Sequence, residues 1–132
     1  MGLRRLLDTN AYVALKRGHG GVADLVRDSQ ELVLSMVVVG ELLFGFRNGN
    51  QYDRNAKELD ELLASDRVGV LPVTRTTADR FGRIAAALRK AGTPIPSNDI
   101  WIAAHVFESS SELITFDAHF GAVPGLVWNH LS

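Results

Sequence analysis

The sequence predicts an α/β fold in which three layers are built around a mostly parallel sheet. Short apolar segments that suit strands alternate along the chain with longer segments that have helical periodicity. This order is typical of a parallel sheet covered by helices on both faces. The chain contains no repeats, low-complexity segments or linker-like stretches, and its 132 residues suit one domain with a substantial core. We therefore expect a single domain over residues 1–132.

The predicted strands are short and mostly apolar. We expect them at residues 4–7, 31–35, 68–73, 112–116 and 126–128, with the last at an edge of the sheet. The first of these strands ends abruptly in Asp8, and the fourth ends in Asp117.

Helical periodicity predicts helices at residues 11–16, 22–27, 36–46, 52–63, 74–90 and 98–107, and one helical turn at residues 118–121. Ser35 and Thr74 stand where N-caps are favoured, because their hydroxyls accept hydrogen bonds from unpaired backbone N–H groups. The apolar stripe expected on the helix at residues 74–90 consists of Ala78, Phe81, Ala85 and Leu88.

The helix predicted at residues 36–46 is apolar on nearly every side. A helix of this kind is buried by its own domain or by a partner subunit. One small domain does not easily cover so much apolar surface, and Trp101 and Phe107 add to it. We therefore expect a homodimer, or a dimer within a larger complex.

Charge and composition exclude several classes of function. The 14 basic and 15 acidic residues give a net charge of −1, which provides no overall attraction to nucleic acid or to anionic membranes. The absence of cysteine excludes disulfides, thiol nucleophiles and Cys-ligated zinc. No signal-peptide core follows the N-terminal arginines, and the most apolar stretch, residues 32–46, is too short to span a bilayer. We expect a cytoplasmic protein with no membrane association.

Four acidic residues fall where an α/β sheet places its ligands. Asp8 and Asp117 each follow a predicted strand, Asp99 lies in the first turn of a predicted helix, and Glu41 lies in the helix after the second strand. In a parallel sheet these positions can share the edge at which such folds bind ligands. Each acid also has a structural interpretation, as a helix cap or first-turn acid for the aspartates and as the partner of an arginine for Glu41.

Convergence of these carboxylates predicts a divalent cation. Like charges at one edge repel each other, and a hard cation bound through oxygen ligands relieves the repulsion, which points to Mg²⁺ or Mn²⁺. Such ions suit phosphodiester or phosphoryl transfer, because they activate water and neutralise charge on the attacked phosphate. The chain has no histidine pair with zinc spacing and no serine nucleophile elbow.

The segments that carry these acids resemble the motifs of the PIN-domain ribonucleases, most closely the VapC-type toxins of bacterial toxin–antitoxin pairs. Leu6–Asn10 is similar to the opening motif of that family, Ser35–Leu42 to the second, Pro96–Ala104 to the third and Thr115–Phe120 to the fourth. Val123–Val127 resembles the usual tail of the family. Each motif alone is weak, but the four together, in this order and at these intervals, are specific.

The resemblance implies a PIN-like fold, with a parallel sheet of about five strands in a three-layer sandwich. It also implies Mg²⁺- or Mn²⁺-dependent endonucleolytic cleavage of RNA. The metal-binding acids would be Asp8, Glu41, Asp99 and Asp117, and Asn10 and Thr115 would orient a ligand or water. The implied partners are a second copy of the chain and a cognate antitoxin protein that covers the acidic pocket.

Two other classes of protein are alternatives. A phosphoacceptor receiver domain has a similar length and alternation, but Asp8 has no acidic neighbour before Asp24, and no lysine follows Gly92. That class therefore fits poorly. A non-catalytic PIN-like module that binds RNA or a partner protein is the second alternative. The presence of all four acids favours the enzyme, and metal-dependent cleavage of RNA separates the two.

Overall fold

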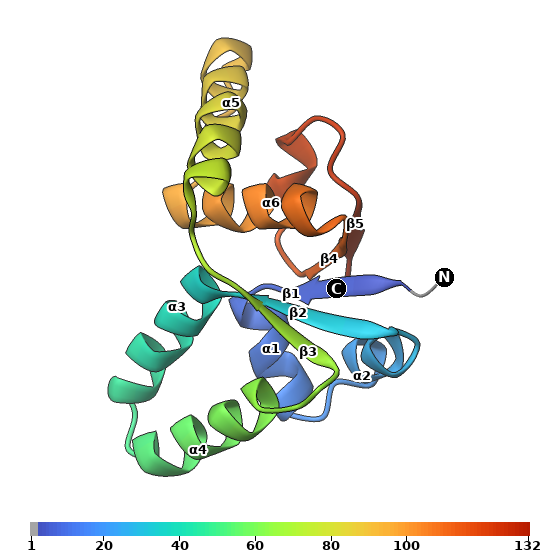
Figure 1. Cartoon of the computed structure of the whole chain (residues 1–132), viewed down its shortest axis with the longest axis vertical. Coiled ribbons are helices and arrows are strands. Elements are labelled where there is room, and N and C mark those ends of the chain that lie inside the picture. Colours follow the sequence, from blue (N-terminus) through green and yellow to red (C-terminus); the bar gives the residue numbers. More distant parts are fainter. Residues whose placement is uncertain (1–2) are drawn as a thin grey trace.

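The computed structural model describes residues 3–132, which form a five-stranded sheet with helices on both faces (Figure 1). The strands are β1 (Arg4–Leu7), β2 (Glu31–Ser35), β3 (Val68–Leu71), β4 (Glu112–Thr115) and β5 (Trp128–His130). Their order is β3-β2-β1-β4-β5, and every neighbouring pair is parallel. The predicted parallel α/β sheet is confirmed, as is the edge position of the last strand.

The helices divide between the two faces of the sheet. They are α1 (Thr9–Lys16), α2 (Gly20–Arg27), α3 (Met36–Arg47), α4 (Tyr52–Leu63), α5 (Arg75–Ala91) and α6 (Ser97–Ser109), with a 3₁₀ helix, η1 (Ala118–Ala122). Figure 1 shows α5 and α6 on one side of the sheet and α1 to α4 on the other. The three predicted layers are therefore present.

The three central strands carry the core. Their middle residues are almost completely buried, at 2% exposure or less: Leu6, Leu7, Val33, Leu34, Leu113 and Ile114. A strand that is covered on both faces has a continuous run of apolar residues in its sequence, rather than alternating apolar and polar residues. Since β1 lies between β2 and β4, the carboxyl ends of these three strands are neighbours at one edge of the sheet. Leu7 pairs with Ile114, so Asp8 comes next to Thr115.

The predicted N-caps of two helices are confirmed. The Ser35 hydroxyl accepts a hydrogen bond from the backbone N–H of Val37 at 3.1 Å, and Thr74 forms a capping box with Thr77 at the start of α5. Two helices begin two residues earlier than predicted, α1 at Thr9 and α2 at Gly20, and α6 begins at Ser97, one residue earlier. Their first turns are polar or glycine-rich, so the apolar periodicity that marks a helix begins only later.

Two strand boundaries differ from the prediction. β3 ends at Leu71 rather than at residue 73, because Pro72 has no N–H to continue the ladder. The Pro72 carbonyl accepts a hydrogen bond from Nε2 of buried His105 instead, at 3.1 Å. The last strand lies at residues 128–130 rather than 126–128. A turn at Gly125, with φ of 77°, directs Leu126 into the core before pairing with β4 begins.

The apolar stripe predicted for α5 is only partly correct. Thr77, Ile84 and Leu88 are the buried residues of this helix, whereas Ala78 is exposed. Phe81 is half-buried and stacks on Trp101 of α6, with ring centroids 4.1 Å apart. Figure 1 shows α5 packed on α6 and extending past it. A helix that rests on one other helix buries a narrow face, and the sequence pattern did not show which face that is.

Helix α3 leaves apolar side chains exposed in the single chain. It buries Val38, Val39 and Leu42, but Phe44 is 69% exposed and Met36 is 45% exposed. The expectation that this helix carries more apolar surface than its own domain covers is confirmed. Among the helices of residues 3–132, none combines the length and the apolar character needed to cross a membrane.

Candidate active site

A cleft of about 600 Å³ opens at the carboxyl edge of the sheet. Its walls include all four predicted acids, Asp8, Glu41, Asp99 and Asp117, together with Asn10. These residues come from the first turn after β1, from α3, from the start of α6 and from the segment after β4. No lysine or arginine of residues 3–132 lines this cleft. The fold therefore gathers the dispersed acids into one negatively charged depression.

Asp8 is at once a helix cap and a wall of the cleft. It is 4% exposed, and Oδ1 accepts a hydrogen bond from the backbone N–H of Ala11 at 2.9 Å. Oδ2 accepts one from the Thr115 hydroxyl at 2.5 Å. Asp8 therefore caps α1 with one carboxylate oxygen and accepts the hydrogen bond of Thr115 with the other, while its side chain lines the cleft.

The environment of Asp8 favours its protonated form. Burial raises the pKa of Asp8 from its ordinary value of 3.8 to about 6. The hydrogen bonds from Thr115 and Ala11 act in the opposite direction, because they stabilise the ionised carboxylate. The negative charges of Asp117 and Asp99 raise the pKa further. A carboxylate in this setting is stabilised by any positive charge that enters the cleft.

Glu41 is held by neutral side chains. Its Oε1 accepts a hydrogen bond from the Thr9 hydroxyl at 2.6 Å, and its Oε2 accepts one from the Asn98 amide at 3.2 Å. Within the part of the chain that the structure describes, no arginine or lysine forms an ion pair with Glu41. The structural alternative considered for Glu41, an ion pair with an arginine, is therefore wrong for the isolated chain.

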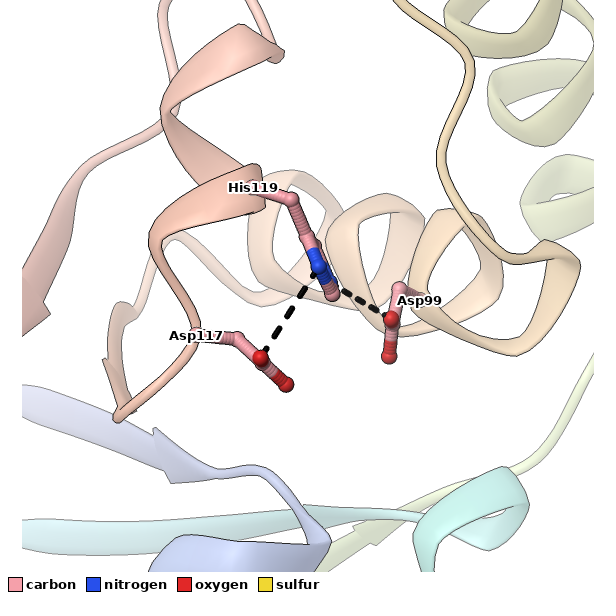
Figure 2. A group of neighbouring side chains, drawn as sticks. All are labelled: Asp99, Asp117 and His119. Atoms are coloured by element: carbon pink, nitrogen blue, oxygen red, sulfur yellow. Dashed lines mark hydrogen bonds and ion pairs between the residues drawn. The ribbon is translucent and has the colours of Figure 1, made fainter.

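Asp99, Asp117 and His119 also line the cleft, and Figure 2 shows their side chains pointing toward one another. Nε2 of His119 lies 2.7 Å from Oδ2 of Asp99, and Nδ1 lies 3.8 Å from Oδ1 of Asp117. Partial burial raises the pKa of Asp99, the bond to His119 lowers it, and the charges of Asp117 and Glu41 raise it. Each of the three side chains offers a ligand atom within 4.8 Å of the other two, so the group can hold a metal ion.

The two predicted polar helpers occupy different places. Asn10 is exposed on the wall of the cleft. Thr115 is completely buried behind Asp8, where its hydroxyl donates to Asp8 and accepts from the backbone N–H of Asp117 at 3.0 Å. Thr115 therefore orients two of the acids rather than facing the cleft.

Three residues of the site did not emerge from sequence reasoning: Thr9, Asn98 and His119. Each lies one or two positions from a predicted acid, and each contacts a carboxylate. Their position beside the predicted acids could have identified them, because polar residues next to a metal ligand in the sequence often hold that ligand in place. The sequence did not show which acid each of them would reach: Thr9 follows Asp8 but bonds to Glu41.

Comparison with known proteins agrees with this architecture. The PIN domain family model matches residues 5–126. Ribonuclease VapC1 of Haemophilus influenzae is 30% identical to this chain, over 93% of this chain and 94% of that protein.

Two solved structures contain chains with a similar fold. The structure of VapBC-1 from nontypeable Haemophilus influenzae contains a chain with a TM-score of 0.83 and 28% identity, covering 97% of this chain and 98% of that one. VapBC2 from Rickettsia felis, bound to a DNA fragment from its promoter, contains a chain with a TM-score of 0.85 and 21% identity, covering 98% of this chain and 100% of that one. At 21% identity, the similarity to the Rickettsia felis chain shows a shared fold and nothing more. The chain belongs to the PIN-domain family, among its VapC-type members.

Proposed function

We propose that this chain is a divalent-cation-dependent endoribonuclease and the toxin of a type II toxin–antitoxin pair. The observation that carries the proposal is the convergence of Asp8, Glu41, Asp99 and Asp117 on one cleft of a PIN domain. The name of the relative Ribonuclease VapC1 supports RNA as the substrate. Cellular RNA as substrate also favours a cytoplasmic location.

In this proposal the four acids hold the cation. When bound, Mg²⁺ or Mn²⁺ would activate water and neutralise charge on the attacked phosphate and the leaving oxygen. Oxygen-rich ligands favour these two ions over softer metals. Thr115 fixes the direction of the Asp8 carboxylate, and Thr9 with Asn98 fixes that of Glu41. Asn10, on the wall of the cleft, is placed to orient a phosphate oxygen or a water molecule.

The proposed protein partner is a cognate antitoxin. The solved structures that this chain resembles include those of VapBC-1 and VapBC2. A cleft lined by carboxylates and without a basic residue is a good receptor for a guanidinium, which pairs with a carboxylate through two parallel hydrogen bonds. We expect the antitoxin to inhibit by placing a basic side chain near Asp8 and Asp99.

The proposed assembly is a homodimer that covers the exposed side of α3. Phe44 and Met36 are large apolar side chains that the single chain leaves in water. Burial of such residues is the main source of stability in homodimer interfaces.

A non-catalytic PIN-like module is the second candidate, and it is not favoured. A module that only binds RNA has no need for carboxylates that repel the phosphate backbone. The burial of Asp8, with a pKa raised to about 6, costs stability without serving such a role.

The test is cleavage of bulk cellular RNA by metal-stripped protein, with Mg²⁺, with Mn²⁺ and with EDTA. The proposal expects internal cuts that require either cation and that stop with EDTA, whereas the same protein leaves single-stranded DNA of equal length intact. Binding of RNA without cleavage in every condition would support the non-catalytic module instead.

A further inference from the structure

His119 is a nitrogen donor in a cleft whose other charged groups are all carboxylates. Its side chain is 34% exposed, so the ring is accessible from the cleft yet partly enclosed. Nε2 faces Asp99 and Nδ1 faces Asp117, as Figure 2 shows. An imidazole that presents one nitrogen to each of two carboxylates lies between them rather than at their rim.

The fold fixes this position. η1 begins directly after Asp117, and Phe120, next to His119, is completely buried and anchors the turn. The rings of His119 and Phe120 are also in contact, with centroids 5.0 Å apart. The buried Phe120 on one side and the hydrogen bond from the Asp117 N–H to Thr115 on the other restrain the backbone that carries His119.

The distances suit a single cation. Ligand atoms on opposite sides of a small divalent ion are roughly 4 Å apart, given bond lengths of about 2.0–2.2 Å. The ligand atoms of Asp99, Asp117 and His119 all lie within 4.8 Å of one another, so small rotations of these side chains bring them to that separation.

We propose that one ring nitrogen of His119 ligates the cation together with Asp99 and Asp117, which makes this a mixed nitrogen–oxygen site that favours Mn²⁺ over Mg²⁺. The inference rests on the proposed function, since it concerns the cation of the same cleft. Mg²⁺ is a hard cation that prefers oxygen ligands and retains water, whereas imidazole is a typical ligand of transition metals. Loss of the imidazole therefore weakens the binding of Mn²⁺ more than that of Mg²⁺.

The experiment is electron paramagnetic resonance of Mn²⁺ bound to the metal-stripped full chain. Pulsed measurements detect ¹⁴N that is bound directly to Mn²⁺, and continuous-wave titration gives the dissociation constant. The variants are His119→Ala and His119→Gln; the glutamine keeps a polar side chain of similar reach. His130→Ala is the matched control, because this exposed imidazole bonds to the Phe116 carbonyl and does not line the cleft.

The expected result is a directly bound ¹⁴N signal in the wild type and in His130→Ala, and no such signal in either His119 variant. The dissociation constant of Mn²⁺ should rise about tenfold or more in His119→Ala, a loss typical of disturbed metal sites. The constant for Mg²⁺, measured by competition against Mn²⁺, should rise by a smaller factor.

Two results of the resonance experiment would overturn the inference by themselves. One is Mn²⁺ bound through oxygen alone in the wild type, which would make His119 a positioning residue that holds Asp99 by its hydrogen bond. The proposed function would survive that result, because metal-dependent RNA cleavage is measured separately. The other is a ¹⁴N signal that persists in both His119 variants. Failure of the wild type both to bind Mn²⁺ and to cleave RNA would refute the inference and the proposed function together.

Discussion

Thr115 donates a hydrogen bond of 2.5 Å to Asp8, although the two residues are 107 positions apart in the sequence. The same hydroxyl accepts a hydrogen bond from the backbone N–H of Asp117. One buried side chain thus connects the end of β1 with the end of β4. Since a hydrogen bond to the ionised form lowers a carboxyl pKa, Thr115 opposes the burial that raises the pKa of Asp8.

Replacing this threonine should change the titration of Asp8. Thr115→Val keeps the shape of the side chain and removes the donor, so the pKa of Asp8 should rise above its present value of about 6. The valine also removes the acceptor for the Asp117 N–H, and the loss of both hydrogen bonds should cost about 2 kcal/mol of stability. NMR titration of the Asp8 carboxyl carbon in metal-stripped protein measures the first effect. Thr115→Ser, which keeps the donor, is the control, and an identical Asp8 pKa in the valine variant would contradict the role of this bond.

Asp8→Asn should stabilise the metal-stripped protein at neutral pH. The pKa of Asp8 is 3.8 when exposed and about 6 in the fold, so the folded state binds the proton more tightly. The stability that this proton provides is fully present below the unfolded-state pKa of 3.8. It is lost as the pH rises through the folded-state pKa of about 6, at a cost of about 3 kcal/mol. Asparagine carries no charge and avoids that loss.

Urea unfolding in EDTA at about pH 4 and about pH 7.5 checks this linkage. At each pH, the quantity of interest is the unfolding free energy of the asparagine variant minus that of the wild type. This difference should be larger, in favour of the variant, at the higher pH. An equal difference in unfolding free energy at the two pH values would show that burial does not disfavour the ionised form of Asp8.

Asp99→Ala should remove much of the response of the fold to metal. A cation that binds only the native state stabilises it by mass action, by about 2.7 kcal/mol at a concentration one hundred times the dissociation constant. Burial and the charges of Asp117 and Glu41 raise the pKa of Asp99, so without metal the alanine variant should be as stable as the wild type or more so. Four melting curves decide the matter: both proteins, each with EDTA and with excess Mg²⁺. If the alanine variant is less stable than the wild type in EDTA and Mg²⁺ raises its melting temperature as much as that of the wild type, Asp99 only stabilises the first turn of its helix.

Catalysis should depend on the charge of the acids rather than on their shape. Asp8→Asn and Asp99→Asn each keep the size of the side chain and remove a cation ligand, so kcat/KM for RNA cleavage should fall about 100-fold or more. Circular dichroism should show an unchanged fold. Asp60→Asn, on the exposed side of α4, is the matched control and should cleave normally. Near-normal cleavage by either site variant would refute the assignment.

Phe44→Glu should weaken self-association. Phe44 is 69% exposed on α3, and a charge at this position would oppose burial in an interface. Light scattering at micromolar concentration should give a dimer for the wild type and a monomer for the variant. The buried residues of α3 are unchanged by this substitution, so the melting temperature of the monomer reports whether the fold is intact. A monomeric wild type would contradict the proposed dimer.

Local patterns in the sequence were sufficient for the fold class. Runs such as Leu32–Leu34 are apolar because their strand is covered on both faces, and polar caps such as Ser35 and Thr74 mark where helices begin. These signals depend on neighbouring residues along the chain. The sequence by itself therefore determined the alternation of strands and helices, the parallel sheet, and the four acids that follow or flank its carboxyl ends.

The tertiary structure decided which side chain each acid meets. Thr9 adjoins Asp8 in the sequence but bonds to Glu41, whereas Asp8 bonds to Thr115 from a distant strand. His119 reaches Asp99 because the turn of η1 and the start of α6 meet across the cleft. Such pairings depend on strand register and on the direction of each side chain, and both are set by long-range packing. A pattern of neighbouring residues carries no information about either, which is why the acids were predictable and their partners were not.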